Sequence, residues 1–213
     1  MDVDSIINRV GELASGDDAP AGDYKTTILS HVNAAKDELF TRVAEVSRDF
    51  RNATNTYTTD ANGQITLSAA PFKVLSVFDT TNDNKLERSS FSDLEEKDVD
   101  LDDTGTPYYF VWDGSTTISA HPIKQSVNLR VRTIEDAADL AAGGAESTIP
   151  FPRAFHWALV YGALVHLHLY ERDALVASEM ANAKRLYEQW KGQLIQYYIT
   201  SSGKNRRVEY QDF

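Results

Sequence analysis

Few residues in this 213-residue chain have the types and spacing that chemistry requires. Three histidines, His156, His166 and His168, fall in the apolar segment 152–170. His166 and His168 are two positions apart, which places them on different faces of a helix, so we do not expect them to share a metal ion. His156 lies ten residues before His166. We interpret all three as core or rim histidines with satisfied ring nitrogens.

Other motifs fall short of the patterns that they approach. Asp79, Thr81 and Asp83 have the spacing of the start of a calcium loop, but Asn84 stands where glycine is required and no glutamate follows at the right distance. The sequence has no glycine-rich phosphate loop and no nucleophile elbow. Without cysteine it can form neither a thiolate metal site nor a disulfide. We therefore predict no catalytic residue, no metal site, no cofactor and no enzymatic activity.

Charge is the second chemical signal in the sequence. The chain has 21 Lys and Arg against 32 Asp and Glu, a formal net charge of −11. This balance argues against wrapping nucleic acid, because phosphate neutralisation needs clustered cations. The acidic segment, Asp79–Asp103, holds ten acids and only three bases. It is either a solvated face or a surface that repels DNA or meets a basic partner.

The segment 152–170 is the element around which the rest of the chain is predicted to pack. Apolar residues occupy almost all of its faces, which predicts a helix that is buried on all sides. Pro152 suits the first helical turn, where its missing N–H needs no partner. A membrane span is the competing interpretation, but the three histidines and the charged residues at both ends favour a core helix.

Three further helices are predicted around this central one. Periodic apolar residues indicate a short helix from about Val3 to Leu13 and a long helix from Asp23 to about Arg51, with Lys36 on its polar surface. The last helix begins near Asp173 and packs back on the central helix as an antiparallel hairpin.

The pattern between the second and third helices is that of strands. Seven runs are β-prone: 54–59, 64–68, 72–78, 85–89, 108–112, 116–120 and 127–134. Hairpins are expected at the Asn-Gly turn of 60–63 and at Asp113-Gly114. A single helical turn is expected over 92–98 with Ser92 as its cap. Residues 137–147 are expected to be a flexible lead-in to the central helix.

The predicted fold class is α+β and mainly helical. It is a four-helix assembly around a central apolar helix, with a β-rich insertion between the second and third helices and an extended C-terminal tail. The expected domains are 1–53 (N-terminal helices of the helical domain), 54–136 (β-rich insertion), 137–199 (C-terminal helical hairpin) and 200–213 (extended C-terminal tail). No basic region followed by an apolar run opens the chain, so no signal peptide is expected.

Several short motifs occur in a recognisable order along the chain. They are Val32-Asn-Ala-Ala35, Gly105-Thr-Pro-Tyr-Tyr109, Gly114–Pro122, Leu129-Arg-Val131, Ile149-Pro150, Phe155–Ala163 and Tyr170-Glu-Arg-Asp173. Together with the order of helices and strands, they resemble the head-to-tail adaptor (connector) proteins of tailed bacteriophages. The stretch from Gly105 to Pro122 is the most distinctive part, and the resemblance covers nearly the whole chain.

The resemblance implies a structural virion protein that forms an adaptor ring, typically of twelve copies, between portal and tail. DNA would pass through its channel without specific binding. The implied partners are copies of the chain itself, the portal protein, and stopper or tail proteins, with no membrane. The implied location is the head–tail interface of the virion, after assembly in the host bacterial cytoplasm. Alternatives are another neck or tail protein (a stopper or tail terminator) or, less in keeping with the sequence, a small-ligand-binding domain or enzyme.

Two sets of residues follow as candidate sites. Adaptors of the resembled family dock through C-terminal extensions, so the tail is expected to bind portal through Lys204, Arg206, Arg207, Val208, Tyr210 and Phe213. Lys and Arg would hold passing DNA by counterion release. The channel or its rim is therefore expected to be lined by acids: Asp93, Glu95, Glu96, Asp98, Asp100, Asp102 and Asp103. Neighbouring copies are expected to pack through the helices 23–51 and 173–194, with loops of the β-insertion adding contacts.

Overall fold

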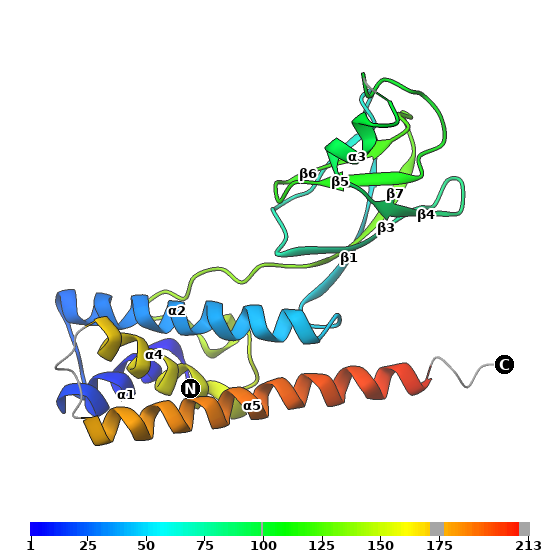
Figure 1. Ribbon diagram of the computed structural model, residues 1–213. Helices are drawn as coiled ribbons and strands as arrows, with labels where there is room; N and C mark the ends of the chain where they lie inside the picture. The colour runs from blue at the N-terminus through cyan, green and yellow to red at the C-terminus, as the bar shows by residue number, and fades with distance from the viewer. Residues whose placement is uncertain (99, 171–176, 209–213) are drawn as a thin grey trace. The chain divides into compact units, whose positions relative to one another are not determined.

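The chain divides into two compact units. The computed structural model describes residues 1–98, 100–170 and 177–208, with 202–208 as backbone only. Unit 1 consists of Met1–Ser47 and of the chain from Ala137 onward, and unit 2 is Arg48–Asp136. Among the described residues, unit 1 holds the four longer helices, and unit 2 holds the strands and one short helix (Figure 1).

Unit 1 is built around its central helix, α4. Its helices are α1 (Val3–Ser15), α2 (Gly22–Val46), α4 (His156–Tyr170) and α5 (Ala177–Val208), with 3-10 turns at Glu146–Thr148 and Arg153–Phe155. Helix α4 contacts α1, α2 and α5, and its middle, including Leu159, Ala163 and Leu167, is fully buried. The prediction of burial on all sides is wrong at the C-terminal end, because Leu169 and Tyr170 are 68% and 77% exposed.

Lys36 on α2 was predicted to lie on the polar surface of the helix, and this prediction is wrong. This side chain is fully buried, and its Nζ donates to the carbonyl oxygens of Ala137 and Ala138 at 3.1 and 3.2 Å and lies 3.1 Å from Asp139 Oδ1. Asp37 Oδ1 lies 3.0 Å from the same atom, so four oxygens replace the water that the ammonium group loses on burial. Asn33 adds a two-way amide contact with Leu140. The lead-in to α4 is therefore fixed to α2, and the prediction of a flexible segment is wrong.

Helix α5 is longer than predicted. It continues to Val208, so the extended tail predicted from residue 200 is wrong for 200–208. A single glycine in this stretch, Gly203, costs a helix only about 1 kcal/mol, which is too little to end a long one. Asp173, the predicted start of this helix, and residues 209–213 lie outside the described residues.

Unit 2 is a nearly closed sheet of seven strands. The strands are β1 (Asn52–Thr58), β2 (Gln64–Thr66), β3 (Lys73–Asp79), β4 (Asn84–Arg88), β5 (Tyr109–Trp112), β6 (Thr117–His121) and β7 (Asn128–Ile134). Their order is β1-β7-β3-β4-β5-β6-β2. The paired neighbours are antiparallel except β4 and β5, which run parallel.

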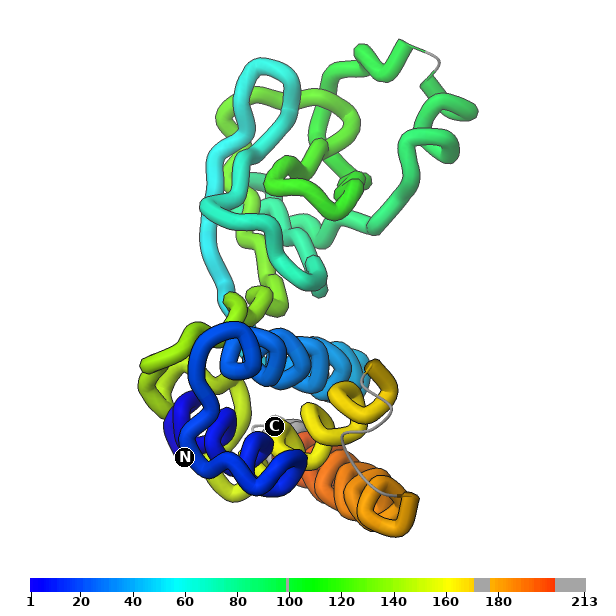
Figure 2. The backbone as a smooth tube through the Cα atoms, turned by 90° about the vertical axis from the view of Figure 1, so that its left-hand side faces the viewer, coloured from blue at the N-terminus to red at the C-terminus, as the bar shows by residue number. Residues whose placement is uncertain are grey.

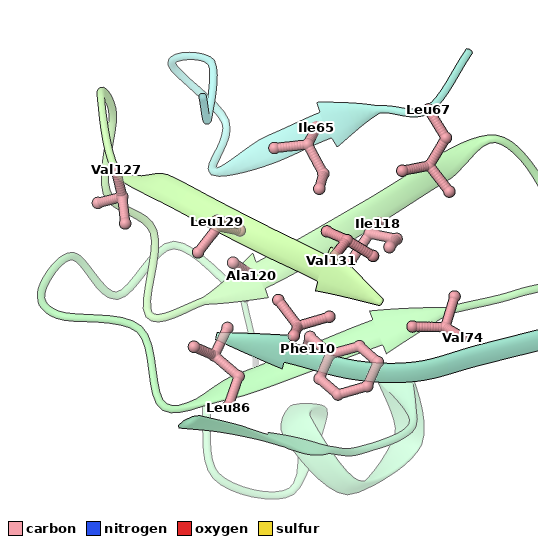
Figure 3. Packing of buried hydrophobic residues seen from close by; sticks show 11 residues of the cluster. Ile65, Leu67, Val74, Leu86, Phe110, Ile118, Ala120, Val127, Leu129 and Val131 are labelled. Atoms are coloured by element: carbon pink, nitrogen blue, oxygen red, sulfur yellow. The ribbon is translucent and has the colours of Figure 1, made fainter. Parts of the chain in front are cut away.

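The interior of this sheet is apolar. Side chains from six strands and adjoining turns point toward one another in Figure 3, and the cluster consists of Ile65, Leu67, Val74, Val77, Leu86, Phe110, Ile118, Ala120, Val127, Leu129 and Val131. Successive strand residues point to opposite faces. The buried Leu129 and Val131 of β7 therefore leave Arg130 and Arg132 on the outer face, as the predicted strand with one wet face requires.

The predicted fold class is wrong in its proportions. The fold is α+β, but the nearly closed seven-stranded sheet replaces the small β-rich insertion of a mainly helical four-helix assembly. The turn at 60–63 forms, with Asp60 N–H donating to the Gln64 carbonyl oxygen at 2.9 Å. Its two strands nevertheless do not pair, because β1 pairs with β7 and β2 pairs with β6. Long-range pairing, invisible to local turn chemistry, closes the sheet.

Two further local predictions for unit 2 concern the second hairpin and the short helix. The hairpin at Asp113-Gly114 is confirmed, since β5 and β6 pair across it. The short helix α3 (Phe91–Glu95) is present, but Ser90, paired with Asp93, forms its capping box. The predicted cap, Ser92, therefore lies within the helix.

Candidate interaction surfaces

The first of the three α4 histidines is satisfied within the core. His156 is fully buried, and its Nε2 donates to the Phe151 carbonyl oxygen at 3.1 Å. The Nδ1 atom of the same ring then accepts from the Met1 amine at 3.3 Å. Burial lowers the pKa of His156 below its ordinary value, because the charged form loses its hydration. The interpretation as a satisfied core histidine is confirmed for this residue.

His166 belongs to a polar network that joins three helices of unit 1. Its Nε2 lies 3.4 Å from Glu38 Oε2 on α2, while Lys191 Nζ on α5 lies 3.2 Å from Glu38 Oε1. Burial raises the pKa of Glu38, but the neighbouring Tyr187 hydroxyl and Lys191 ammonium outweigh that effect and hold the pKa below its ordinary value. Burial, followed by the Glu38 charge, raises the pKa of Tyr187. This network fixes helix packing.

His166 and His168 each have one ring nitrogen that is not hydrogen-bonded among the described residues. Nε2 of His166 and Nδ1 of His168 are buried without a hydrogen-bond partner in the part of the chain that the structure describes. The prediction that the ring nitrogens are satisfied is therefore wrong for these two histidines.

The acidic segment lies at the β4–β5 side of unit 2, in and after α3. Of the residues predicted to face a channel, six are exposed: Asp93, Glu95, Glu96, Asp100, Asp102 and Asp103. The seventh, Asp98, has a side chain that is only 10% exposed and lies 3.5 Å from His121 Nε2. These seven acids thus form a solvated acidic surface with one inward-facing carboxylate, that of Asp98.

Asp98 also belongs to a cluster that the sequence did not reveal. One ligand atom each from Asp98, Asp103 and His121 lies within 4.8 Å of the others. Two carboxylates and an imidazole are a donor set that divalent cations accept. The same set is also satisfied without a metal, since Asp98 Oδ2 accepts from the Asp103 N–H at 2.9 Å. No spacing in the sequence indicated this cluster, because His121 lies at the end of β6, whereas Asp98 and Asp103 lie between α3 and β5.

The motif that resembled a calcium loop has another role. Asp79 is fully buried, and its carboxylate accepts from the backbone N–H groups of Thr81 and Asn82 and from the Asn82 amide. These bonds hold the turn between β3 and β4.

A basic groove on the outer face of unit 2 was also missed. It has a volume of about 520 Å³ and is lined by Arg48, Asn52, Thr54, Leu75, Ser76, Phe78, Lys85, Arg130 and Arg132. Arg130 lies over the Phe78 ring at 4.9 Å, and Arg132 Nη2 donates to Asp49 Oδ1 at 2.8 Å. In the sequence, the groove is indicated only by Arg130 and Arg132, which alternate with apolar residues along β7. Its other lining residues come from distant positions that the pairing of strands brings together.

The chain was compared with protein families and with curated proteins. Residues 1–208 match the family described as SU10 adaptor protein. The chain belongs to this family. The match spans both units, and it confirms the resemblance to phage head-to-tail adaptors. The search of curated proteins found no match.

Membership in the SU10 adaptor family sets the general character of the protein. It is a structural phage protein of the head–tail interface, of a kind that contacts other head and tail proteins and is not an enzyme. None of the helices that the structure describes has the length and apolar character of a membrane span.

The portal-binding residues predicted for this family member fall at the end of the chain. Lys204, Arg206, Arg207 and Val208 are on the last turns of α5, where the structure gives the backbone alone. Tyr210 and Phe213 lie outside the described residues.

Proposed function

We propose that this SU10-family adaptor forms a ring between the portal and the tail, and that DNA passes through the lumen of that ring. The ring would contain about twelve copies, as the resemblance to head-to-tail adaptors implies, and would assemble in the host cytoplasm. The observation that carries the proposal is the family match over residues 1–208, which includes both units of the chain.

Side-by-side packing through α2 and α5 is the proposed basis of the ring. A closed ring needs a heterologous interface, in which two different patches of one copy meet. Tyr197 and Ile199 on α5 are 46% and 45% exposed, which makes this stretch of the helix unusually apolar for a surface. Such residues gain by being covered by a neighbouring copy or by portal.

The acidic segment supports the proposed lumen. We place Asp93, Glu95, Glu96, Asp98, Asp100, Asp102 and Asp103 at the channel or its rim. Six of these carboxylates, all but that of Asp98, are exposed. They would repel the phosphate backbone and let DNA slide, whereas cations would retain it.

The C-terminal segment is the proposed portal contact. Its basic residues, including Lys204 and Arg206, have a charge opposite to that of the chain as a whole. One segment alone would bind weakly, because fixing each long Lys or Arg side chain against portal costs about 1.5–2 kcal/mol of rotamer entropy. A ring presents many such segments at once, so their weak affinities combine through effective concentration.

Imaging tests the ring directly. Negative-stain images or native mass spectra of the purified chain, alone and with portal, should show closed rings. A two-fold dimer or an isolated copy in assembled particles would contradict the proposal.

Truncation after Thr200 tests the portal contact. The shortened chain should keep the helical circular dichroism and melting temperature of the full chain but no longer sediment with portal rings. A charge change elsewhere in unit 1, Arg9→Ala on the exposed side of α1, is the matched control and should leave portal binding intact. Unchanged portal binding by the truncated chain would show that the contact lies elsewhere.

A further inference from the structure

We infer that the basic groove of unit 2 binds α3 and its flanking carboxylates from a second copy of this chain. Neighbouring copies would then also join head to tail through their β-rich units. The inference rests on the proposed ring and adds to it a specific pair of surfaces.

The groove is built to receive an acidic group next to an apolar one. Four of its lining residues are cations, Arg48, Lys85, Arg130 and Arg132, and none is a carboxylate. Leu75 and Phe78 supply apolar lining between the cations. Among the described residues, Arg132 is the only groove cation with an ion pair, which it forms with Asp49. The groove therefore keeps an excess of positive charge on a chain whose formal charge is −11.

Helix α3 has the complementary composition. Phe91 opens the helix with 44% of its surface exposed, and the exposed carboxylates of Asp93, Glu95 and Glu96 flank it. The element is held in place by the buried Leu94 and by its capping box. Preorganisation of this kind lowers the entropy lost on binding.

A nearby cation does not cancel the charge of α3. Lys97 Nζ lies 4.3 Å from the centre of the Tyr109 ring, which draws the ammonium group toward β5. The carboxylates of Glu95 and Glu96 are thus available to an external cation. An aromatic side chain surrounded by charges is also the usual composition of an interface anchor.

The two surfaces are separate patches, as a head-to-tail contact requires. The groove runs across β1, β7, β3 and β4, whereas α3 lies in the connection from β4 to β5, and no residue of α3 lines the groove. In Figure 2, β1 (cyan) and the segment that contains α3 (green) lie on opposite sides of unit 2. A copy can therefore offer its α3 to one neighbour while its own groove accepts the α3 of another.

DNA is the competing occupant of a basic groove. The ten acids that face only three bases in the acidic segment belong to the same small unit, and they oppose the approach of a long polyanion. A second copy brings an exposed apolar side chain, Phe91, beside its carboxylates. It therefore matches the apolar Leu75 and Phe78 of the groove as well as its cations, which a phosphate backbone does not. The docked α3 would border the lumen, and the loop with Asp100, Asp102 and Asp103 would remain free to face DNA.

Charge reversal on each side tests the contact. The groove variant carries Lys85→Glu and Arg130→Glu, and the α3 variant carries Glu95→Lys and Glu96→Lys; all four side chains are exposed. Asp93 and Arg132 are left unchanged, because they hold the α3 cap and Asp49. Each variant alone should assemble at least about tenfold less readily than the wild-type chain.

An equimolar mixture of the two variants provides the decisive measurement. The reversed groove of one variant matches the reversed α3 of the other, and their unchanged surfaces match as well, so native mass spectra should show rings of alternating copies. Lys73→Glu, an exposed change on β3 outside the groove, is the matched control and should assemble as the wild type does. Circular dichroism melts of all variants check folding.

The outcomes separate this inference from the ring proposal. Wild-type rings together with unimpaired rings of either variant, or no rescue in the mixture, would overturn the α3–groove contact and leave the ring standing. A wild-type chain that forms no ring, alone or with portal, would overturn both. A duplex DNA fragment that binds the wild-type chain but not the groove variant would assign the groove to phosphate and overturn the inference.

Discussion

His156 shows how one buried side chain makes the stability of unit 1 depend on pH. Its ring accepts and donates one hydrogen bond in the neutral form, and a second proton would remove the acceptor. Burial lowers the pKa of His156 from its ordinary 6.5. The unfolded chain therefore binds a proton at this site more readily than the folded chain, so acid favours unfolding.

A pH series should resolve this effect. As the pH falls below about 6.5, the unfolded His156 takes up a proton before the folded one, and the free energy of unfolding should decrease. His156→Gln keeps a donor near the Phe151 carbonyl oxygen but cannot titrate, so its stability should change less over this range. The difference between the two urea-unfolding curves from pH 7.5 to pH 5 isolates the contribution of His156. Parallel curves would show that His156 titrates alike in both states.

Helix packing in unit 1 depends on a close approach at Gly162. A Cβ atom added there would lie 2.8 Å from Ala35 Cβ on α2 and 2.9 Å from Tyr187 Cε2 on α5. Both distances are shorter than carbon contacts allow, so the three helices meet closely at this position. A β-carbon at Gly192 on α5 would contact nothing within 4 Å.

These two glycines form a matched pair for mutation. Gly162→Ala should destabilise the protein by about 1–3 kcal/mol, because overpacking forces the helices apart. Gly192→Ala should be neutral or stabilising by up to about 1 kcal/mol, because alanine is the better helix former. Thermal or urea unfolding measures the change in unfolding free energy for both variants. Because both substitutions gain the same helix propensity, the difference between the two changes reports the steric clash at Gly162. Equal effects would show that α4 does not lie this close to its neighbours.

The success of the sequence predictions differed between kinds of element. Helices with a regular apolar stripe were predicted well, and α1 begins at Val3 as expected, with the Asp2 carboxylate accepting from Ser5 N–H at 2.8 Å. Lys36 was misplaced because three of the four oxygens that satisfy it come from a loop about a hundred residues later. The strands were found, but their pairing was not, because the partners of β1 and β2 are set by closure of the sheet.

The candidate sites were predictable to a lesser extent, for the same reason. The acidic segment is continuous in sequence, so counting charges found it. The basic groove combines Arg48, Lys85 and Arg130 from distant positions, and the Asp98–His121 contact joins a loop to a strand. Such surfaces exist only once the sheet has formed.

At the scale of the whole molecule, unit 2 has the features of an independently folding module. It has its own apolar interior, and its first and last strands pair, with Asn52 opposite Ile134. Beyond the ladder, Glu135 N–H donates to the Arg51 carbonyl oxygen at 3.1 Å. Both ends of the module are therefore tied together by its own hydrogen bonds.

An excised fragment tests this independence. Residues 48–136 should fold alone, with a β-type circular dichroism spectrum and a single cooperative urea transition. A fragment of 54–136 is the control; it lacks the Asn52–Ile134 pair and the Asp49–Arg132 ion pair, so its urea midpoint should be lower. An aggregated or unfolded 48–136 fragment would show that unit 2 needs the helices.

The pairing of β1 with β7 also decides how tension would pass between the two units. Both covalent links between the units adjoin this ladder, one before Asn52 and one after Ile134. A pull on unit 1 draws on both links in the same direction, so the two strands share the load and their mutual hydrogen bonds are neither sheared nor peeled. The β1–β7 ladder is thus a double tether, in which a pull on unit 2 is carried by two strands at once.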